Sequence, residues 1–262
     1  MSTYDNLQYD VTDGRAEITL DRPEKLNAFS TEMLVELNEA ILAAMHDDRA
    51  YVVVLTGAGR GFCSGADVTD MDGRDDRDRK VTYGAHLWKV QNVDRLLYNG
   101  PKPTVAAVNG PAIGAGCDFA LACDMRVMDA DAYLRQQFVN IGLVPGDGGG
   151  WLLPRLVGES KAKEYLLTGR DITAEDAVEM GLAVESVDGD VVGAARDLAN
   201  ELRDKPATAM RLTKSLVDVG RSFEEYAGEA VDAQWECVND AEHTEAVRAL
   251  NEGRAPDFDR EY

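Results

Sequence analysis

Two glycine-rich turns, each preceded by an apolar run, carry the residues best suited to chemistry. The run at 51–56 leads into the turn at 57–67, and the run at 105–108 leads into the turn at 109–118. The small residues 114–116 lie where the pattern predicts the start of a helix. N–H groups at a helix start have no intrahelical partner and attract developing negative charge, and small side chains let a ligand approach them. If both turns aim an N–H group at one oxygen, they form an oxyanion hole.

Several motifs resemble those of the enoyl-CoA hydratase/isomerase (crotonase) superfamily. They are RPEKLNA at 22–28, FCSGAD at 62–67, NGPAIGAGCD at 109–118, GLVPGDGG at 142–149, LTGR at 167–170 and GLA at 181–183. Each motif alone is weak, but together they follow the family's order along nearly the whole chain. The resemblance implies an α/β fold, a crotonase-type spiral of repeated ββα units with a helical C-terminal part that assembles a homo-trimer or a dimer of trimers. We expect the spiral core at 1–200 and the helical part at 201–262.

The resemblance also implies which backbone groups bind the substrate carbonyl. It assigns the two oxyanion donors to the N–H groups of Ala66 and Ala115. A thioester carbonyl becomes an enolate when a proton leaves, or water adds, next to it. Two short N–H bonds to that oxygen would stabilise the enolate more than the ground state, which is what catalysis requires.

A second set of positions matches the family's coenzyme A pocket. The segment that lines the adenosine and phosphate pocket corresponds to Lys25, Leu26 and Ala28, and the segment that meets the adenine corresponds to Asp67 and Val68. Lys25 suits a phosphate contact because coenzyme A is highly anionic, although an ordinary surface lysine is the alternative. Coenzyme A is part of the substrate, so no separate cofactor is expected.

The acid–base residues depart from the pattern of the family's hydratases. Those enzymes hold a water with two Glu residues; the first falls on Asp118 and the second on Phe138, which cannot transfer a proton. Asp147 offers another carboxylate, one residue later than the Asp that some isomerases of the family carry. Asp118 and Asp147 are therefore both candidate catalytic residues. The structural alternative for Asp118 is a favourable interaction with the helix dipole in the first helical turn, and the alternative for Asp147 is that it only shapes its turn. Phe138 and Gln137 are expected to line the substrate pocket, and Gln136 or Gln137 could orient a water.

These residues predict an enzyme that acts on acyl-CoA thioesters. The leading interpretation is reversible hydration of a 2-enoyl-CoA to a 3-hydroxyacyl-CoA. Allylic double-bond isomerisation is the alternative, because it needs one proton shuttle and not two carboxylates. A non-catalytic acyl-CoA-binding subunit is the alternative of another class. The three His are scattered outside the motifs and the four Cys lack metal spacing, so neither a His-based triad nor a metal site is expected.

The composition is strongly acidic. There are 48 Asp and Glu against 27 Lys and Arg, the formal net charge is −21, and only eight of the basic residues are Lys. This excess repels nucleic acids and anionic membrane surfaces, so neither is an expected partner. It is also typical of a halophilic protein, because salt screens the self-repulsion; a solvated acidic surface is the plainer alternative. The N-terminus lacks the features of a signal peptide and no apolar run is long enough to span a membrane, so a cytoplasmic location is expected.

The remaining pattern is that of strands alternating with helices. We expect a hairpin of strands 7–12 and 15–20, further strands at 51–56, 104–108 and 124–128, and helices at 82–98 and 115–122. Another helix should begin after Ser30 and run to about His46. Its expected apolar face is Met33, Leu34, Leu37, Ile41, Leu42 and Met45.

Beyond Leu182 the pattern turns helical. The helical segments lie near 190–204, 207–219 and 222–251. The charged run at 70–80 is interpreted as a solvated loop, with a substrate-adjacent lid as the alternative.

Overall fold

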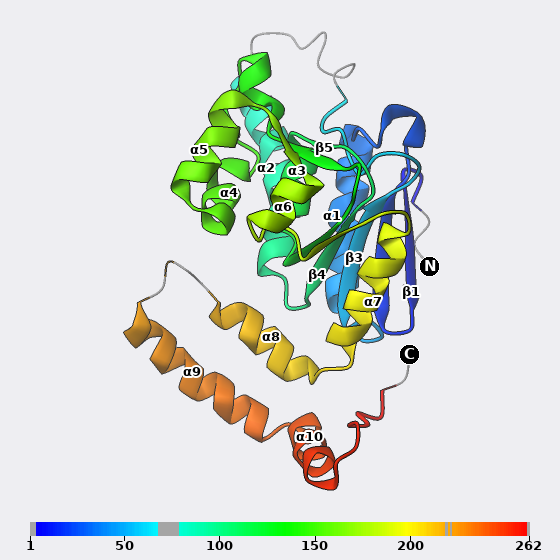
Figure 1. Cartoon of the computed structure of the whole chain (residues 1–262), viewed down its shortest axis with the longest axis vertical. Helices are drawn as coiled ribbons and strands as arrows, with labels where there is room; N and C mark the ends of the chain where they lie inside the picture. Colours follow the sequence, from blue (N-terminus) through cyan, green and yellow to red (C-terminus); the bar gives the residue numbers. More distant parts are fainter. Residues whose placement is uncertain (1–3, 68–78, 218–219, 221, 261–262) are drawn as a thin grey trace.

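The computed structural model describes residues 4–67, 79–217, 220 and 222–260, and its centre is a six-stranded sheet (Figure 1). The strands, in spatial order, are β1 (Leu7–Thr12), β2 (Arg15–Leu20), β3 (Val52–Gly57), β4 (Thr104–Val108), β6 (Met125–Asp129) and β9 (Glu185–Val187). Strand β1 is antiparallel to β2, and every later pair is parallel. Strands β3 and β4 are buried along their whole length, as expected for parallel strands covered on both faces.

The N-terminal hairpin and helix α1 (Thr31–His46) agree with the sequence prediction. The hairpin turns at Asp13 and Gly14, whose φ angles of 50° and 73° are the left-handed values that a tight two-residue turn needs. The Ser30 side chain accepts a hydrogen bond from the Met33 N–H and caps α1. The prediction for Leu42 is wrong, because its side chain is 48% exposed while the rest of the expected apolar face is buried.

A smaller three-stranded sheet and a group of helices lie on one side of the main sheet (Figure 1). The sheet consists of β5 (Ala112–Ile113), β7 (Tyr133–Arg135) and β8 (Asp171–Thr173), and the helices are α2 (Arg79–Asn99), α3 (Ala115–Ala122), α4 (Gly149–Val157), α5 (Glu159–Thr168) and α6 (Ala174–Glu179). Two short 3-10 helices, η1 (Pro23–Lys25) and η4 (Gln137–Ile141), complete this region. The largest hydrophobic core joins the main sheet, α1 and this group through residues such as Leu37, Phe119 and Leu134.

Helix α7 (Val191–Arg203) covers the opposite face of the main sheet. Alternate residues of β3 divide between the two faces: Val53 and Leu55 join the large core, whereas Val52 and Val54 pack toward α7. A parallel strand of this kind must be apolar on both sides, which explains the unbroken apolar run in the sequence.

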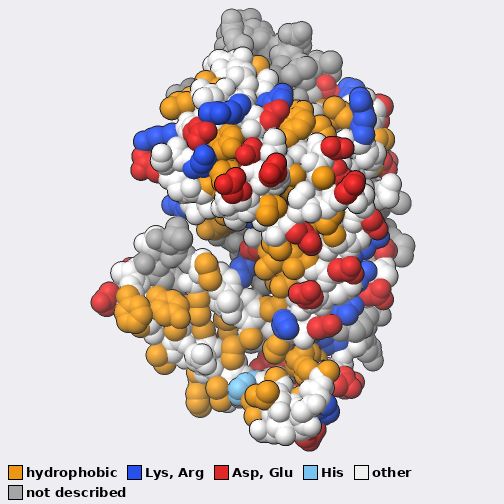
Figure 2. All heavy atoms as spheres, viewed as in Figure 1, with side chains coloured by type: hydrophobic (Ala, Val, Ile, Leu, Met, Phe, Trp, Pro, Cys, Tyr) orange, Lys and Arg blue, Asp and Glu red, His pale blue; other side chains and the backbone are white. Residues whose placement is uncertain are grey.

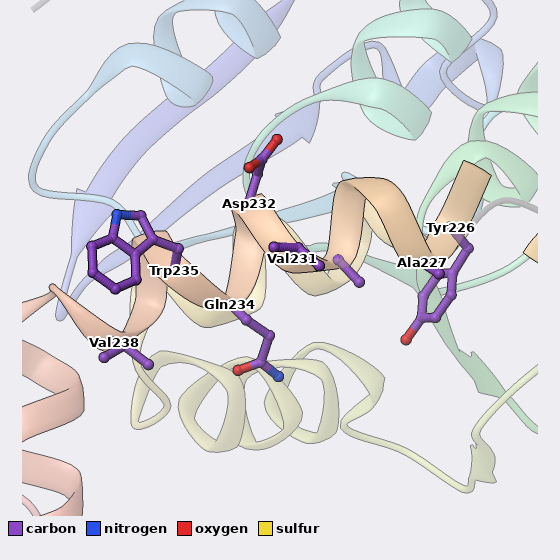
Figure 3. Close-up of a pocket in the computed structure, with 8 residues that line it drawn as sticks. Tyr226, Ala227, Val231, Asp232, Gln234, Trp235 and Val238 are labelled. Atoms are coloured by element: carbon purple, nitrogen blue, oxygen red, sulfur yellow. The ribbon is translucent and has the colours of Figure 1, made fainter. Parts of the chain in front are cut away.

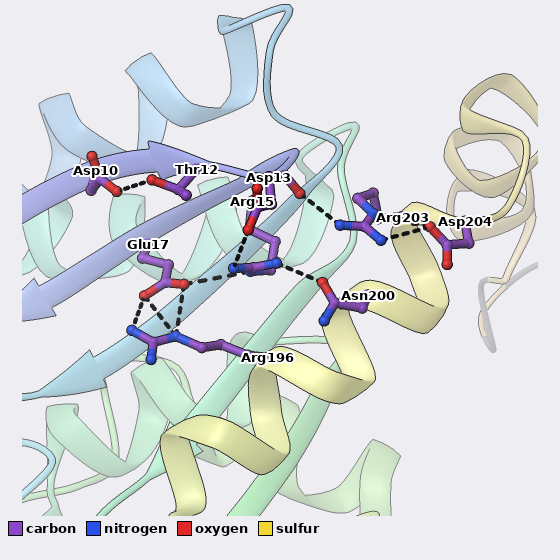
Figure 4. A network of polar contacts seen from close by, with 9 residues as sticks. All are labelled: Asp10, Thr12, Asp13, Arg15, Glu17, Arg196, Asn200, Arg203 and Asp204. Carbon is purple, nitrogen blue, oxygen red and sulfur yellow. Dashed lines mark hydrogen bonds and ion pairs between the residues drawn. The ribbon is translucent and has the colours of Figure 1, made fainter. Parts of the chain in front are cut away.

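A polar network fastens α7 to the N-terminal hairpin (Figure 4). Glu17 on β2 accepts a hydrogen bond from the Arg196 guanidinium at 2.7 Å. Arg15, on the same strand, donates to the side-chain oxygen of Asn200 at 2.6 Å. Because both contacts join α7 to β2, they fix the helix on the sheet.

Three helices follow α7 at the C-terminal end: α8 (Ala207–Leu216), α9 (Phe223–Val238) and α10 (Ala241–Glu252). Figure 1 shows α9 lying apart from the layered body, whereas α8 is tied to it by Lys214, which donates to the carbonyl oxygens of Leu97 and Lys102. The segment expected at 222–251 forms two helices, because Asp240 caps α10 by accepting from the Glu242 N–H. The predicted helical character beyond Leu182 is confirmed, and the short strand β9, which was not predicted, extends the main sheet there. The expected boundary at residue 200 falls within the last turn of α7.

Most of the charged run at 70–80 cannot be compared with the prediction. Residues 70–78 lie outside the described residues, and Arg79 and Lys80 begin α2, where a loop was expected. In the part of the chain that the structure describes, no helix is both long and apolar enough to cross a membrane.

Candidate active site

The two glycine-rich turns lie against each other and are joined by backbone hydrogen bonds. The Cys63 carbonyl accepts from the Ile113 N–H at 2.8 Å. The Pro111 carbonyl accepts from the N–H groups of Phe62 and Cys63, each at 3.2 Å. A side chain at Gly116 would begin only 2.2 Å from the Cys63 carbonyl oxygen. Glycine is therefore needed at this position for the two backbones to meet.

Two Asn side chains hold the first turn in shape. The Asn109 amide donates to the carbonyl oxygens of Gly57 at 2.8 Å and Gly59 at 3.0 Å. The Asn27 amide donates to the carbonyl oxygens of Ala58 at 3.0 Å and Gly61 at 2.7 Å. A turn leaves such carbonyl groups without ladder partners, so side chains distant in sequence supply them.

Ala66 and Ala115 carry the two N–H groups predicted as oxyanion donors. Ala115 is the first residue of α3 and follows Gly114, whose φ of 58° is readily adopted only by glycine. Within the described residues, neither N–H group donates a hydrogen bond to another protein group. A side chain at Gly65, next to Ala66, would lie 3.8 Å from the Ala115 nitrogen. The structure thus brings together two free donors, an arrangement suited to a developing oxyanion.

An aromatic ring lies beside these donors. Phe138, on η4, is buried, and the far end of its ring is 3.8 Å from the place of a side chain at Gly114. The position matched to the second Glu of the hydratases therefore holds an apolar wall. Gln137 is half-buried, and its side-chain oxygen accepts from Asn140 at 3.3 Å within the same short helix.

Asp118 lies at the end of the first turn of α3 and is fully buried. Gln136 Nε2 donates to Asp118 Oδ1 at 2.5 Å, and the backbone of Gly149 lies close to the same oxygen. Burial raises the pKa of Asp118 to about 7, while the hydrogen bond from Gln136 and the nearby Gly149 backbone act to lower it. Asp118 Oδ2 has no partner among the described residues, so it is the oxygen able to take up a proton.

Two further carboxyl groups lie near Asp118. Asp147, in the turn before α4, is half-buried, and burial raises its pKa to about 6. Asp94, on α2, is 6% exposed; burial, and then the negative charges of Asp118 and Asp147, raise its pKa well above the usual range. Asp94 and Asp147 line one cavity of about 300 Å³. Near neutral pH the cluster therefore combines protonated and ionised carboxyl groups, as general acid–base chemistry requires.

The residues predicted to bind coenzyme A meet at the first turn, except Val68, which lies outside the described residues. Lys25 Nζ is 2.5 Å from Asp67 Oδ2, and the Arg22 guanidinium is 3.1 Å from the same oxygen. Lys25 is therefore held by a carboxylate, and a phosphate would have to share or displace that contact.

The backbone of the segment before α1 is also tied to this turn. The Leu26 carbonyl accepts from the Ser64 N–H at 3.0 Å, and the carbonyl of the buried Ala28 accepts from Arg22 at 2.6 Å. These contacts place Lys25, Leu26, Ala28 and Asp67 in one region beside the turn that carries Ala66.

Sequence reasoning missed Asp94, Arg22 and the bracing role of Asn109. For Asp94 a signal exists: it lies within the buried stripe of α2 formed by Val90, Val93 and Leu97, where helical spacing calls for an apolar residue. In the described residues, no group of three or more His, Cys, Asp or Glu is arranged to hold a metal ion.

Comparison with known proteins gives a consistent result. The model of the family "Enoyl-CoA hydratase/isomerase" matches residues 10–261. A probable enoyl-CoA hydratase of Rhodobacter capsulatus is 38% identical over 98% of both chains. A 1,2-epoxyphenylacetyl-CoA isomerase of Escherichia coli is 34% identical, covering 95% of this chain and 96% of the relative.

The fold leads to the same family. The crystal structure of a putative enoyl-CoA hydratase from Streptomyces coelicolor superposes with a TM-score of 0.91 at 32% identity, covering 100% of this chain and 96% of the other. The predicted spiral architecture with a helical C-terminal part is thereby confirmed. The chain belongs to the enoyl-CoA hydratase/isomerase family and is an enzyme of that type.

Proposed function

We propose that the enzyme catalyses reversible hydration of a 2-enoyl-CoA to a 3-hydroxyacyl-CoA. The observation that carries this proposal is the pair of free N–H groups on Ala66 and Ala115, beside the buried carboxyl group of Asp118. Hydration builds negative charge on the thioester oxygen and requires a group that accepts a proton from water. The two N–H groups would stabilise the negative charge, and the Asp118 carboxyl group would accept the proton.

In the proposed reaction the thioester oxygen accepts hydrogen bonds from both N–H groups. The oxygen of a water bonds to C3 while Asp118 Oδ2 accepts one of its protons, and the π electrons of the C2=C3 bond move to form the enolate. Asp147 delivers a proton to C2, which re-forms the thioester carbonyl, and the proton taken up by Asp118 restores the starting charge of the carboxyl cluster. The Phe138 ring beside Gly114 would keep bulk water from the enolate oxygen and so strengthen its hydrogen bonds.

Allylic isomerisation of an enoyl-CoA is the second candidate, and a specific observation favours it. Asp147 is the most accessible carboxyl group of the cluster, with a pKa raised to about 6, which suits a single group that removes and returns a proton. A relative at 34% identity is named an isomerase, although of a different substrate.

The deciding experiment is incubation of the purified enzyme with crotonyl-CoA and, separately, with a 3-enoyl-CoA in molar salt, with products separated by chromatography and identified by mass and by retention against authentic 2-enoyl-CoA and 3-enoyl-CoA. Addition of one water to crotonyl-CoA supports the hydratase. A shift of the double bond without a change in mass supports the isomerase. Failure to convert any member of a broad thioester panel would favour the non-catalytic acyl-CoA-binding alternative.

We also propose that the chain assembles as a homo-trimer or a dimer of trimers through its C-terminal helices. Hydrophobic side chains gather over these helices in Figure 2, and Figure 3 shows Val231, Trp235 and Val238 along an open groove on α9. Trp235 is 70% exposed, and an exposed apolar face of this extent is typical of an interface. Sedimentation of the native chain and of Trp235→Glu tests this: the variant should sediment as a smaller species.

We further propose that the protein works in a salt-rich cytoplasm. The net charge of −21 and the low Lys content support this, because screening by salt would remove much of the self-repulsion.

A further inference from the structure

Asp94 is a buried carboxyl group without a hydrogen-bond partner. It lies on α2, which has no other acidic residue, and is 6% exposed. Neither of its carboxyl oxygens has a partner among the described residues. A side chain at Gly148 would begin 2.3 Å from Asp94 Oδ2, so the carboxyl group lies directly against the backbone of the turn before α4. Such a group destabilises a fold unless it is neutral or serves a function.

The groups that face Asp94 come from every element packed around it. Helix α3 contributes Asp118, and the turn before α4 contributes Asp147, which lines the same cavity. On α2 itself Arg95 also lines this cavity, but its guanidinium donates to the Asn92 side chain at 3.1 Å. No ion pair joins Arg95 to these three carboxyl groups in the described residues, and their mutual repulsion together with burial favours retention of a proton by at least one of them near neutral pH.

Asp94 is best placed to keep that proton. Unlike Asp118, which accepts a hydrogen bond from Gln136, Asp94 accepts none in the described residues. Asp118 Oδ2 is likewise an orphaned buried acceptor, so a proton on Asp94 has an unpartnered acceptor on the neighbouring helix. Asp94 lies against Gly148 and Asp118 lies against the next residue, Gly149, while Asp147 lines the same cavity as Asp94, so Asp94 adjoins both candidate catalytic groups.

We propose that Asp94 is a positioning residue of the active site, a carboxyl group that passes a proton between Asp118 and Asp147. The proposal rests on the proposed hydration reaction. In one turnover Asp118 accepts a proton from the attacking water. The Asp94 O–H gives its proton to the Asp147 carboxylate, which delivers it to C2, and Asp118 then returns its proton to the Asp94 carboxylate. All three groups regain their starting charge, and one water has been added.

The test compares the native enzyme with Asp94→Asn and Asp94→Ala. Asn keeps the shape but cannot carry the proton, so we expect kcat for hydration to fall about ten- to a hundredfold with KM within twofold. In Asp94→Ala the vacated space adjoins the cavity, so formate should restore part of kcat in proportion to its concentration. Neither variant should melt below the native protein by more than a few degrees, because burial of the Asp94 carboxyl group is itself unfavourable to the fold.

A measurement that does not need turnover distinguishes failure of the proposed hydration reaction from failure of the proposed role of Asp94. In carboxyl-carbon NMR with labelled Asp, we expect one carboxyl signal that stays protonated through neutral pH and is missing in Asp94→Asn. If the native enzyme hydrates no thioester, the proposed function fails, while this signal still decides whether Asp94 holds a proton. Asp124→Asn is the matched control, since Asp124 pairs with Thr104 at the far end of β4 and should change stability but not kcat.

Three results would overturn the role of Asp94. One is an Asp94→Asn enzyme with kcat within twofold of native and an unchanged pH profile. Another is a loss of kcat that follows loss of folding and is not restored in Asp94→Ala by formate. The third is absence of the protonated carboxyl signal in the native protein.

Discussion

The two halves of the site are built in different ways. The proposed oxyanion half is made of backbone. Its two turns, 57–67 and 109–118, follow β3 and β4 and are joined to each other by hydrogen bonds. The acid–base half is made of side chains, from Asp94 on α2, Asp118 on α3 and Asp147 in the turn before α4. The oxyanion half depends on local backbone conformation, whereas the acid–base half depends on how three elements pack. The same fold can therefore keep the backbone donors while its carboxyl groups vary.

The largest expected effect comes from removing a base from the side-chain half. If Asp118 accepts the proton of water, Asp118→Asn should lower turnover by roughly two to four orders of magnitude while coenzyme A binding remains. Asp147→Asn should then be milder. Steady-state kinetics on both variants, with binding measured by calorimetry, tests the order. A large loss in Asp147→Asn with a mild effect in Asp118→Asn would transfer the role of base to Asp147.

The next effect comes from the backbone half. Ala115→Pro removes one donor, and turnover should fall about a hundredfold or more. The fold should tolerate it, because Ala115 is the first residue of α3, where Pro is favoured, and its N–H has no protein partner. Ala115→Gly is the matched control, since it keeps the donor and should retain most of the activity. Near-native turnover in Ala115→Pro, with folding verified by circular dichroism, would show that this N–H is not a donor.

A smaller effect concerns stability in the side-chain half. The pKa of Asp118 is about 7 in the folded chain and is near 3.9 when unfolded, so its contribution to stability is present below about pH 4 and is lost as the pH rises through 7. Native protein should therefore lose unfolding free energy relative to Asp118→Asn over this window, by at most about 1.4 kcal/mol per pH unit. Urea unfolding of both proteins at constant salt measures this. A pH-independent difference would mean that Asp118 is not perturbed.

Salt should change the melting temperature of the whole molecule through its net charge and not through the backbone half of the site. Melting temperature should rise with salt because the net charge of −21 repels itself, whereas the backbone hydrogen bonds between the turns carry no net charge. Thermal unfolding across a potassium chloride series tests this. A melting temperature independent of salt would remove the halophilic proposal.

The same division explains what the sequence could predict. The backbone half follows from short-range rules: a buried parallel strand, glycine at a close approach, and a helix start at Ala115. The side-chain half joins residues 94, 118 and 147, and no local rule states that α2 turns Asp94 toward α3. Gln136 contacts Asp118, whereas the neighbouring Gln137 contacts Asn140. Which of the two Gln side chains reaches Asp118 is decided by the packing of η4.

The same limit applies in the C-terminal part. Helical spacing was sufficient to predict α7 and α8, but strand β9 is three residues long and depends on pairing with β6. Exposure of Leu42 on α1 likewise depends on where neighbouring elements end and not on its spacing.

The central claim is that the two turns bind one oxygen while the carboxyl groups face the adjacent carbons. The most direct measurement is a crystal structure with a 3-oxoacyl-CoA, whose β-keto thioester imitates the enolate. We expect the thioester oxygen to lie about 2.7–3.1 Å from both the Ala66 and the Ala115 nitrogen, with a carboxyl oxygen of Asp118 or Asp147 beside C2 or C3. A thioester oxygen that contacts neither nitrogen, or contacts them in separate pockets, would contradict it.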